Sequence, residues 1–342
     1  MFSLNGKTAL ITGSGRGIGL AIAEAMAHQG ANIFLSDINS SVVERAAGEL
    51  AEQYPNVAVR GLTFDVTDKA QIESAMQTIR DAGNGLQILV NNAGINLREP
   101  VADMDDALWQ KMLDTNLTSV FRVSRAAFPM LKEKGGKVIN LCSLMSEIAR
   151  PTVSPYASTK GAVRQFTRAL ATEWAEHNIQ VNGIAPGFIA TDMNIPLMED
   201  KELNDYIMRH TPAKRWGKPS EVASVAAFLA SSKRIKRGAI CRGHGPHVGG
   251  GLHAALELER GHARARHRGE VLDDAVVVRA QGTLARNRLQ AHARLAHEVK
   301  RQTARLGAQP AVGRAPLTQE AREHAHPRVA GANCPVREHL EL

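Results

Sequence analysis

Tyr156 and Lys160 lie four residues apart in SPYASTKGAV (154–163), and Tyr156 is the only tyrosine of the chain with a lysine at this spacing. Helical periodicity over residues 154–177 predicts that both side chains share one helix face. A nearby ammonium group favours the phenolate form of tyrosine, so the pair could supply a general base. A tyrosine that covers a helix start beside a solvated lysine is the alternative, because the spacing alone does not separate the two.

A glycine-rich turn, TGSGRGIG (12–19), follows an apolar strand pattern and precedes an amphipathic helix pattern. Gly13, Gly17 and Gly19 permit a tight turn and close approach of the backbone to a pyrophosphate at the helix N-terminus. Ile18 lies between two of these glycines and is a further candidate cofactor contact. The alternative is an ordinary loop between a strand and a helix. The coincidence of strand, turn and helix with a later acidic residue favours dinucleotide binding.

That acidic residue is Asp37, at the end of the second strand pattern. A carboxylate there can accept hydrogen bonds from a ribose 2′-hydroxyl and repels a 2′-phosphate, so we expect NAD as cofactor. Arg16 lies within the glycine-rich turn, and its guanidinium could serve a phosphate, so NADP stays possible. A nicotinamide ring bound in its oxidised, positive form would add to the effect of Lys160 on Tyr156.

Strand and helix patterns alternate along the first two thirds of the chain. The strand patterns are largely continuous apolar runs, typical of strands buried on both faces of a parallel sheet. We predict an α/β fold with a Rossmann-like, doubly wound parallel sheet flanked by helices. The predicted strands are 8–12, 32–37, 59–66, 86–94, 137–143 and 179–187.

The formal charge of +8 is unevenly distributed. Residues 1–232 carry 22 Lys and Arg against 24 Asp and Glu, while residues 233–342 carry 20 against 10, with no aromatic residue. We therefore predict one Rossmann-fold domain at 1–232, followed by an atypical basic tail at 233–342.

Three cysteines, Cys142, Cys241 and Cys334, show neither metal-ligand spacing nor a disulfide framework, and we expect no metal. We interpret Cys142 as a small buried apolar residue in a strand. The amino end resembles no signal peptide, and no apolar run has the length of a membrane span. The sequence thus favours a cytoplasmic protein without a membrane partner.

Several motifs together resemble the short-chain dehydrogenase/reductase family over residues 4–232. They are TGSGRGIG, NNAG (91–94), Asn116 in DTNLTSVF, Ser143 in NLCS, Tyr156-x-x-x-Lys160 and IAPGFIATDM (184–193). Within the family, the segments CSLMSEIARPTVSPYASTKGAV and TPAKRWGKPSEVA look most like gluconate 5-dehydrogenases and related sugar-acid dehydrogenases.

The resemblance implies roles for the matching residues. Tyr156 would take the substrate hydroxyl proton as hydride leaves for the nicotinamide, Lys160 would bind the ribose, and Ser143 would hold the substrate oxygen. Asn116 would lie at a helix irregularity and hold a water that links Lys160 to solvent. The implied cofactor contacts are Asp65 and Val66 near the adenine, Asn92, Ala93 and Gly94 on the adenine-ribose side, and Pro186, Gly187, Ile189 and Thr191 around the nicotinamide.

Three charged residues are candidates for substrate binding because they occupy loops that follow predicted strands: Arg98, Glu147 and Arg150. A guanidinium suits a sugar-acid carboxylate, and a glutamate suits polyol hydroxyls, although each could equally be a surface charge. We expect residues 194–216 to cover the substrate. The predicted partners are a small sugar acid or polyol and, in a dimer or tetramer, further copies of the chain.

The predicted activity is interconversion of a secondary alcohol and a ketone with NAD or NADP, on a sugar acid such as gluconate. Two alternatives stay open. One is a 3-oxoacyl-thioester reductase, and the other is a non-catalytic nucleotide-binding chain disabled by its altered C-terminus.

The tail departs from the family after AAFLASSK (226–233), where relatives continue with a final strand. Its Arg, Ala, Gly and His content suggests translation in a shifted reading frame, so we expect a poorly ordered frameshift product. The rival interpretation is a genuine basic appendage for nucleic acid or anionic surfaces. It is disfavoured because no aromatic stacking residues or nucleic-acid module are present. Loss of the final strand predicts that strand 179–187 lies at an open sheet edge.

Overall fold

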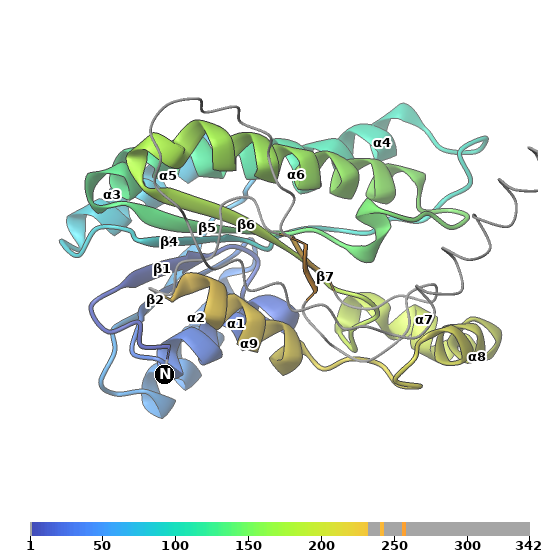
Figure 1. Cartoon of the computed structure of the whole chain (residues 1–342), viewed down its shortest axis with the longest axis horizontal. Coiled ribbons are helices and arrows are strands. Elements are labelled where there is room, and N and C mark those ends of the chain that lie inside the picture. The colour runs from blue at the N-terminus through green and yellow to red at the C-terminus, as the bar shows by residue number, and fades with distance from the viewer. Residues whose placement is uncertain (1, 232–239, 243–254, 258–342) are drawn as a thin grey trace, which may run out of the picture. The chain divides into compact units, whose positions relative to one another are not determined.

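The computed structural model describes residues 2–231, 240–242 and 255–257. Strands and helices alternate along this part of the chain (Figure 1). The strands are β1 (Thr8–Ile11), β2 (Asn32–Asp37), β3 (Val59–Thr63), β4 (Ile88–Asn91), β5 (Gly136–Leu141), β6 (Ile179–Ala185), β7 (Ile240–Arg242) and β8 (Ala255–Glu257). The helices are α1 (Gly17–His28), α2 (Ser40–Gln53), α3 (Lys69–Asp81), α4 (Asp106–Leu113), α5 (Ser119–Lys134), α6 (Ser154–Glu173), α7 (Ile195–Glu199), α8 (Lys201–His210) and α9 (Pro219–Ala230).

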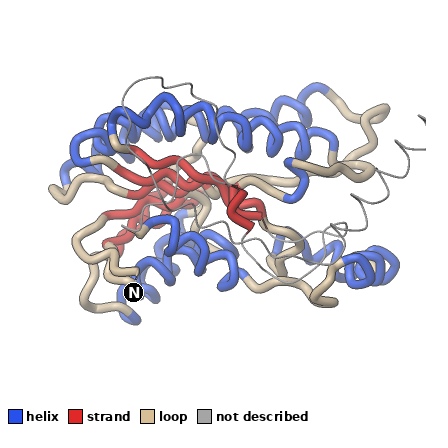
Figure 2. The backbone as a smooth tube through the Cα atoms, in the orientation of Figure 1, coloured by secondary structure: helices blue, strands red, loops and turns tan. Residues whose placement is uncertain are grey.

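The described strands form one sheet in the order β3-β2-β1-β4-β5-β6-β7-β8 (Figure 2). All neighbours pair in parallel except β7 and β8, which are antiparallel. This confirms the predicted doubly wound α/β fold. The chain changes direction across the sheet between β1 and β4, so a crevice is expected at the carboxyl ends of these two strands.

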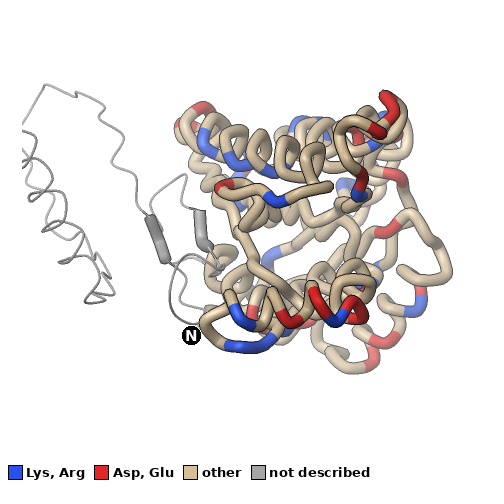
Figure 3. Tube along the Cα trace, turned by 90° about the vertical axis from the view of Figure 1, so that its right-hand side faces the viewer, with Lys and Arg blue, Asp and Glu red and all other residues tan. Residues whose placement is uncertain are grey.

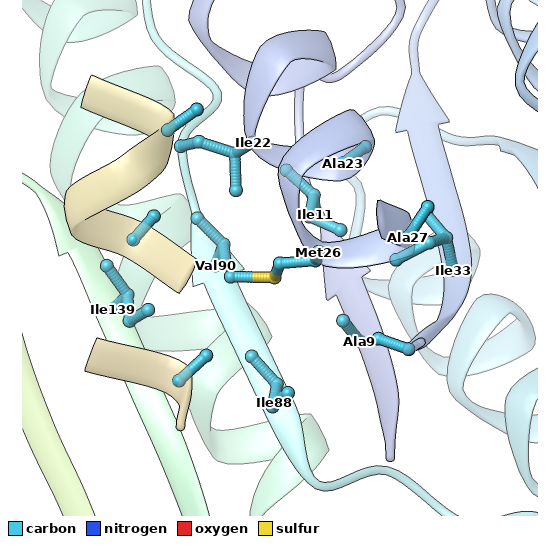
Figure 4. Close-up of a cluster of buried hydrophobic side chains, with 14 of the residues drawn as sticks. Ala9, Ile11, Ile22, Ala23, Met26, Ala27, Ile33, Ile88, Val90 and Ile139 are labelled. Carbon is cyan, nitrogen blue, oxygen red and sulfur yellow. The ribbon is translucent and has the colours of Figure 1, made fainter. Parts of the chain in front are cut away.

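Helices cover both faces of the sheet, which explains the continuous apolar runs of its strands. Ala9 and Ile11 of β1 pack into a core with α1, α2 and α9, whereas Leu10 packs into a second core with α3, α5 and α6. Successive side chains of a strand point to opposite faces, so both faces must be apolar when both are covered. In Figure 4, Met26 of α1 lies over the sheet beside Val90 of β4.

The predicted open edge at β6 is wrong. Gly183, Ile184 and Ala185 of β6 pair in parallel with Ile240, Cys241 and Arg242 of β7, so residues of the atypical tail provide the next strand. Backbone hydrogen bonding needs no particular side chain, which is why an unusual composition did not prevent this pairing. Apart from β7 and β8, the predicted frameshifted tail, including Cys334, lies outside the described residues.

The segment between β6 and α9, which includes the predicted substrate cover at 194–216, contains the helices α7 and α8, and its covering role stays a prediction. Its base is fixed by backbone bonds, in which the Gly217 N–H donates to Phe188 at 2.9 Å and the Ala190 N–H donates to Gly217 at 2.9 Å. The end of this segment is therefore tied to the chain directly after β6.

Basic and acidic positions are interspersed in both helix layers (Figure 3), in keeping with the near balance of charge over residues 1–232. None of the helices that the structure describes is long and apolar enough to cross a membrane.

Candidate active site

A cavity of about 1180 Å³ opens at the carboxyl ends of the parallel strands. It gathers most residues predicted for the cofactor and for catalysis. Those in its lining are Gly13, Arg16, Gly17, Ile18, Asp37, Asp65, Val66, Asn92, Ala93, Gly94, Ser143, Arg150, Tyr156, Lys160, Pro186, Gly187, Ile189 and Thr191. Gly19, Asn116, Arg98 and Glu147 do not line it.

The glycine-rich turn lies against the loop that follows β4. Gly13 has a φ of +61°, and a Cβ there would lie 2.8 Å from the Cα of Ala93. Gly19 lies behind the turn, where a Cβ would come within 2.4 Å of the Gly13 carbonyl oxygen. Gly19 therefore serves helix packing, while Gly13 and Gly17 form the cavity wall.

The N-terminus of α1 points at this wall without a side-chain cap. Arg16 precedes the helix, and its side chain makes no capping hydrogen bond. The first N–H groups of a helix otherwise lack partners and carry a partial positive charge. The turn thus fits a bound pyrophosphate.

Asn92 joins β4 to the turn. Its side-chain amide donates to the carbonyls of Thr12 at 2.9 Å and Gly13 at 2.7 Å, and its backbone N–H donates to the Thr12 hydroxyl at 3.0 Å. These bonds therefore hold the side chain and the backbone of Asn92 in one orientation at the cavity wall. Thr12, which the sequence analysis had passed over, is the buried partner that fixes it.

Asp37 lies at the carboxyl end of β2 in the cavity lining, where its carboxylate accepts a hydrogen bond from the Asn39 N–H at 3.1 Å. Gly15 was missed by the sequence analysis, yet a Cβ there would lie 3.0 Å from this carboxylate and 2.6 Å from Val42. The short distance shows that the turn passes directly beside Asp37. A missing side chain leaves little sequence signal, beyond the extra glycine in the motif.

Tyr156 and Lys160 occupy the first two turns of α6, whose start is favoured by Pro155 in the first turn. Lys160 is 5% exposed, and its ammonium donates to the Leu141 carbonyl at 2.6 Å. The Lys160 Nζ lies 5.7 Å from the centre of the Tyr156 ring. The predicted i to i+4 pair is thus present on a helix whose lysine is anchored to the end of β5.

Ser143 follows β5 and opens the short 3₁₀ turn Leu144–Ser146. Its hydroxyl oxygen accepts the Met145 N–H at 3.1 Å, while its own N–H donates to Ser146. An accepting hydroxyl still has its own proton to donate. Ser143 can therefore offer a hydrogen bond to a substrate oxygen in the cavity.

Asn116 lies in a π-helical segment, Asp114–Thr118, between α4 and α5, so the predicted helix irregularity is present. Its amide is fully buried and exchanges two hydrogen bonds with the backbone of Ile95, at 2.8 and 2.9 Å. A Cβ on Gly94 would lie 3.1 Å from the Asn116 oxygen and 3.8 Å from Lys160 Nζ. Asn116 thus lies close behind the cavity wall near Lys160, and its water-holding role stays a prediction.

Arg98 and Arg150 form a cationic pair near Tyr156. Burial lowers the pKa of Arg98, an effect that Tyr156 opposes. Burial also lowers the pKa of Arg150, and the positive charge of Arg98 lowers it further. Within the part of the chain that the structure describes, Nε and Nη2 of Arg98 are buried without a hydrogen-bond partner.

The loop that carries Arg150 has an unusual backbone. Thr152 has a φ of +67°, uncommon for a β-branched residue, and its carbonyl accepts the Glu99 N–H at 3.1 Å. This bond ties the Arg98 loop to the Arg150 loop. Such strain persists only where the surroundings enforce it, and it is frequent at functional sites.

Glu147 is paired with Arg164 of α6 and lies away from the cavity lining. The two side chains are 28% and 19% exposed, respectively. The structure thus separates Glu147 from the two arginines with which it had been grouped. Arg164 had no role in the sequence analysis, because a single arginine in a helix gives no signal of its partner.

Arg16 reaches from the glycine-rich turn across to Asp192, with Nη1 and Oδ2 3.1 Å apart. Asp192 follows Thr191, and both line the cavity. This pair joins the predicted phosphate-binding turn to the segment predicted to surround the nicotinamide. Both side chains are largely exposed, so the ion pair contributes little to stability.

A family model described as enoyl-(acyl carrier protein) reductase matches residues 13–253, a range that includes β7. The 5-keto-D-gluconate 5-reductase of Escherichia coli K12 is 41% identical over 257 residues, which cover 75% of this chain and 99% of that protein. The 3-oxoacyl-[acyl-carrier-protein] reductase of Vibrio harveyi is 38% identical over 252 residues, covering 73% and 99%.

Among solved structures, a gluconate 5-dehydrogenase from Burkholderia cenocepacia in complex with NADP and tartrate is 40% identical. The two superpose with a TM-score of 0.68 over 73% of this chain and 96% of the other. The similarity thus spans nearly all of the relatives but only part of this chain.

Cys142 provides a test of the packing behind Ser143. Burial raises the pKa of its thiol to about 11, against the opposing effect of the nearby Lys160. Since the thiolate is the reactive form, a native sample at pH 8 should contain roughly a hundredfold less Cys142 thiolate than an exposed thiol would. We expect iodoacetamide to leave the Cys142 peptide unmodified in the native protein and to alkylate it in urea, as read by mass spectrometry. Equal rates in both states would contradict this packing.

Proposed function

The chain belongs to the short-chain dehydrogenase/reductase family, and we propose that it interconverts a secondary alcohol and a ketone on a sugar acid, using NAD or NADP. The observation that carries the proposal is the convergence of Tyr156, Lys160 and Ser143 with Arg150 in one cavity, next to Arg98, whose positive charge lowers the pKa of Arg150 and whose Nε and Nη2 are unpaired among the described residues. The first three residues fit proton transfer at a carbinol, and the last two fit an anionic substrate.

The residues present fit a nicotinamide dinucleotide. The uncapped N-terminus of α1 and the turn at Gly13 and Gly17 would hold the pyrophosphate, and Asp37 would hold the adenosine ribose. Asp65 and Val66 would lie near the adenine, with Asn92, Ala93 and Gly94 beside the adjoining ribose. Lys160 would bind the nicotinamide ribose, and Pro186, Gly187, Ile189 and Thr191 would surround the ring. When bound, the cofactor supplies the acceptor or donor of the hydride.

The protein's own residues handle the proton and the orientation of the substrate. In the oxidation direction, the Tyr156 phenolate takes the hydroxyl proton as the carbinol C–H bond breaks, and the C–O bond becomes a carbonyl. The Lys160 ammonium lies 5.7 Å from the centre of the Tyr156 ring, which places a positive charge beside the proton acceptor. Ser143 donates to the substrate oxygen and keeps it near Tyr156. Asn116 supports the loop next to Lys160 through Ile95.

A carboxylate substrate would neutralise the two arginines. A guanidinium buried without a partner is unfavourable, and a carboxylate can satisfy it with two charge-assisted hydrogen bonds. Asn96 lines the cavity beside this pair, and its buried side-chain oxygen has no hydrogen-bond partner in the described part of the chain, so it can accept from a substrate hydroxyl. The sugar acid for which the Escherichia coli relative is named and the tartrate in the Burkholderia cenocepacia complex both combine a carboxylate with hydroxyl groups.

The 3-oxoacyl-thioester reductase alternative is supported by the similarity to the Vibrio harveyi enzyme. The same catalytic residues would serve both reactions. A thioester carries no charge near its reacting carbonyl, so it would leave Arg98 unpaired, and this favours the sugar acid. The non-catalytic alternative is disfavoured because the described residues bring the catalytic side chains together.

Cofactor choice depends on Asp37 and Arg16. Asp37 at the end of β2 supports a preference for NAD, because its carboxylate repels a 2′-phosphate. Arg16 is engaged by Asp192 and is thereby drawn toward the nicotinamide end of the cavity. The Burkholderia cenocepacia relative binds NADP, so both cofactors belong in the assay.

We propose that residues 1–232 carry the catalytic machinery, with β7 of the tail extending their sheet, and that the chain acts as a homo-oligomer in the cytoplasm. Exposed aromatic side chains on adjoining helices, Trp109 of α4 and Phe121 of α5, support self-association. The cytoplasmic location is supported by the intracellular supply of nicotinamide cofactors that the reaction would require.

The proposed function is tested with the purified chain, gluconate or 5-ketogluconate and either cofactor, by following nicotinamide absorbance. We expect turnover, and we expect Tyr156→Phe to lower kcat by about 10²- to 10⁴-fold, because the ring stays and only the proton carrier is lost. Cofactor affinity measured by fluorescence should be nearly unchanged. A fully active Tyr156→Phe variant would refute the mechanism, and turnover of 3-oxoacyl thioesters alone would refute the substrate.

Asp37→Ala should shift the ratio of kcat/KM values toward NADP by about tenfold or more, because it removes both the ribose acceptor and the repulsion of a 2′-phosphate. Asp81→Ala is the matched control, since Asp81 is an exposed aspartate at the end of α3 that bonds Gln77 and does not line the cavity. An unchanged ratio in Asp37→Ala would show that this carboxylate does not contact the ribose.

Arg150→Met should raise KM for gluconate by about tenfold or more, since a charge-assisted hydrogen bond is lost, while KM for the neutral polyol sorbitol changes little. Arg45→Met on the exposed face of α2 is the control and should leave both values unchanged. An equal effect of Arg150→Met on the charged and the neutral substrate would argue against a carboxylate contact.

A further inference from the structure

The helix α6 presents a row of three functional groups at intervals of one turn. Tyr156, Lys160 and Arg164 follow each other at i, i+4 and i+8, and therefore lie along one side of the helix. The mechanism uses the first two. Arg164 continues the row away from the cavity lining.

The segment 143–147 runs beside this row and makes contacts with two of its members. The Ser146 hydroxyl donates to the Lys160 backbone carbonyl at 2.9 Å, and one turn further along α6 the Glu147 carboxylate meets the Arg164 guanidinium. Ser146 also accepts the Ser143 N–H at 3.2 Å. Ser143 is thus linked to α6 through its own short turn.

A third contact fixes the other side of the segment. The Leu144 N–H donates to the Pro186 carbonyl at 2.9 Å, which joins the turn after β5 to the chain that follows β6. With Leu144 held at the carboxyl end of β6, the ion pair and Ser146 determine how the turn lies along α6. The distance between the Ser143 hydroxyl and the Tyr156 phenol depends on that placement.

We propose that Glu147 and Arg164 are positioning residues, whose ion pair holds the Ser143 turn in register with the Tyr156 side of α6. The proposal rests on the proposed dehydrogenase function. Glu147 is a residue for which the sequence analysis expected a substrate contact, and the pair with Arg164 gives it a different task. Its carboxylate acts through Ser143 and touches no substrate.

The partial burial of the two side chains supports this role over that of a fully exposed ion pair. Exposed pairs such as Lys69 with Glu73, whose side chains are 68% and 62% exposed, contribute little because solvent screens them. Glu147 and Arg164 are each less than a third exposed. Removal of one partner leaves the other charge partly desolvated and unpaired, which is unfavourable. We expect that charge to move toward solvent and the Ser143 turn to move with it.

The experiment compares Glu147→Gln, Arg164→Met and the double variant by steady-state kinetics, normalised to active sites by NADH titration. We expect each single variant to lower kcat about ten- to hundredfold, since a misplacement of about 1 Å can cost this much. KM for the sugar acid should change less than about threefold. The double variant should be no slower than the slower single variant, because both remove the same contact.

Two further variants serve as controls. Glu147→Asp keeps the negative charge, so its kcat should be higher than that of Glu147→Gln. If the loss of kcat came only from lower protein stability, restoring the charge would not raise kcat. Glu73→Gln removes the carboxylate of the exposed pair on α3 and should leave kcat at the wild-type value.

Three outcomes would overturn the proposal. If Glu147→Gln raises KM for the sugar acid about tenfold while Arg164→Met leaves KM unchanged, Glu147 binds the substrate. If the effects of the single variants on kcat multiply in the double variant, the residues act separately. Wild-type kcat in both single variants would show that the pair positions nothing.

A crystal structure of Glu147→Gln separates failure of this inference from failure of the proposed function. We expect Ser143 to shift relative to Tyr156 whether or not any sugar acid is turned over. An unshifted Ser143 would refute the positioning role, while an inactive wild-type chain with a shifted Ser143 in the variant would refute only the proposed reaction.

Discussion

Lys160 holds a nearly fully buried ammonium group, and its hydrogen bond to the Leu141 carbonyl joins α6 to the end of β5. A buried charge is unfavourable unless polar groups surround it, so the helix and the strand end must stay together. Tyr156 lies one turn before Lys160, and Ser143 lies two residues after Leu141. The same contact therefore sets the positions of both the proposed base and the residue proposed to orient the substrate.

Beneath this contact, buried polar side chains fix the spacing of β4, β5 and α6. The Asn91 amide donates to Asn140 at 2.8 Å, and the Asn140 amide donates to Thr167 at 2.9 Å. Each bond joins neighbouring elements in the interior, where an unpaired amide would be costly. The loops after these strands carry the site, so a slip of one element would be passed directly to Tyr156, Ser143 and Asn92.

The sequence predicted the parts of the site whose signals are local. The Tyr156–Lys160 spacing, the glycine-rich turn and Asp37 each depend on a few adjacent residues and on one strand end, and the structure brings them to one cavity. The sheet followed from apolar runs that buried strands require. Pairings across long stretches of chain were missed, namely Glu147 with Arg164, Arg16 with Asp192, and Gly15 beside Asp37. β7 was missed because backbone pairing leaves no mark on composition.

The ion pair of Glu147 with Arg164 and the cationic pair of Arg98 with Arg150 differ in one physical respect. Arg164 has a carboxylate partner in the chain, so its charge is already balanced and serves to hold structure. Arg98 and Arg150 have each other as neighbours, and the described residues leave Nε and Nη2 of Arg98 unpaired. Like charges kept together under partial burial raise the free energy of the empty site, and an anionic ligand lowers it. The balance of charge, which composition could not reveal, thus separates Arg164, for which we propose a positioning role, from Arg98 and Arg150, for which we propose a contact with an anionic substrate.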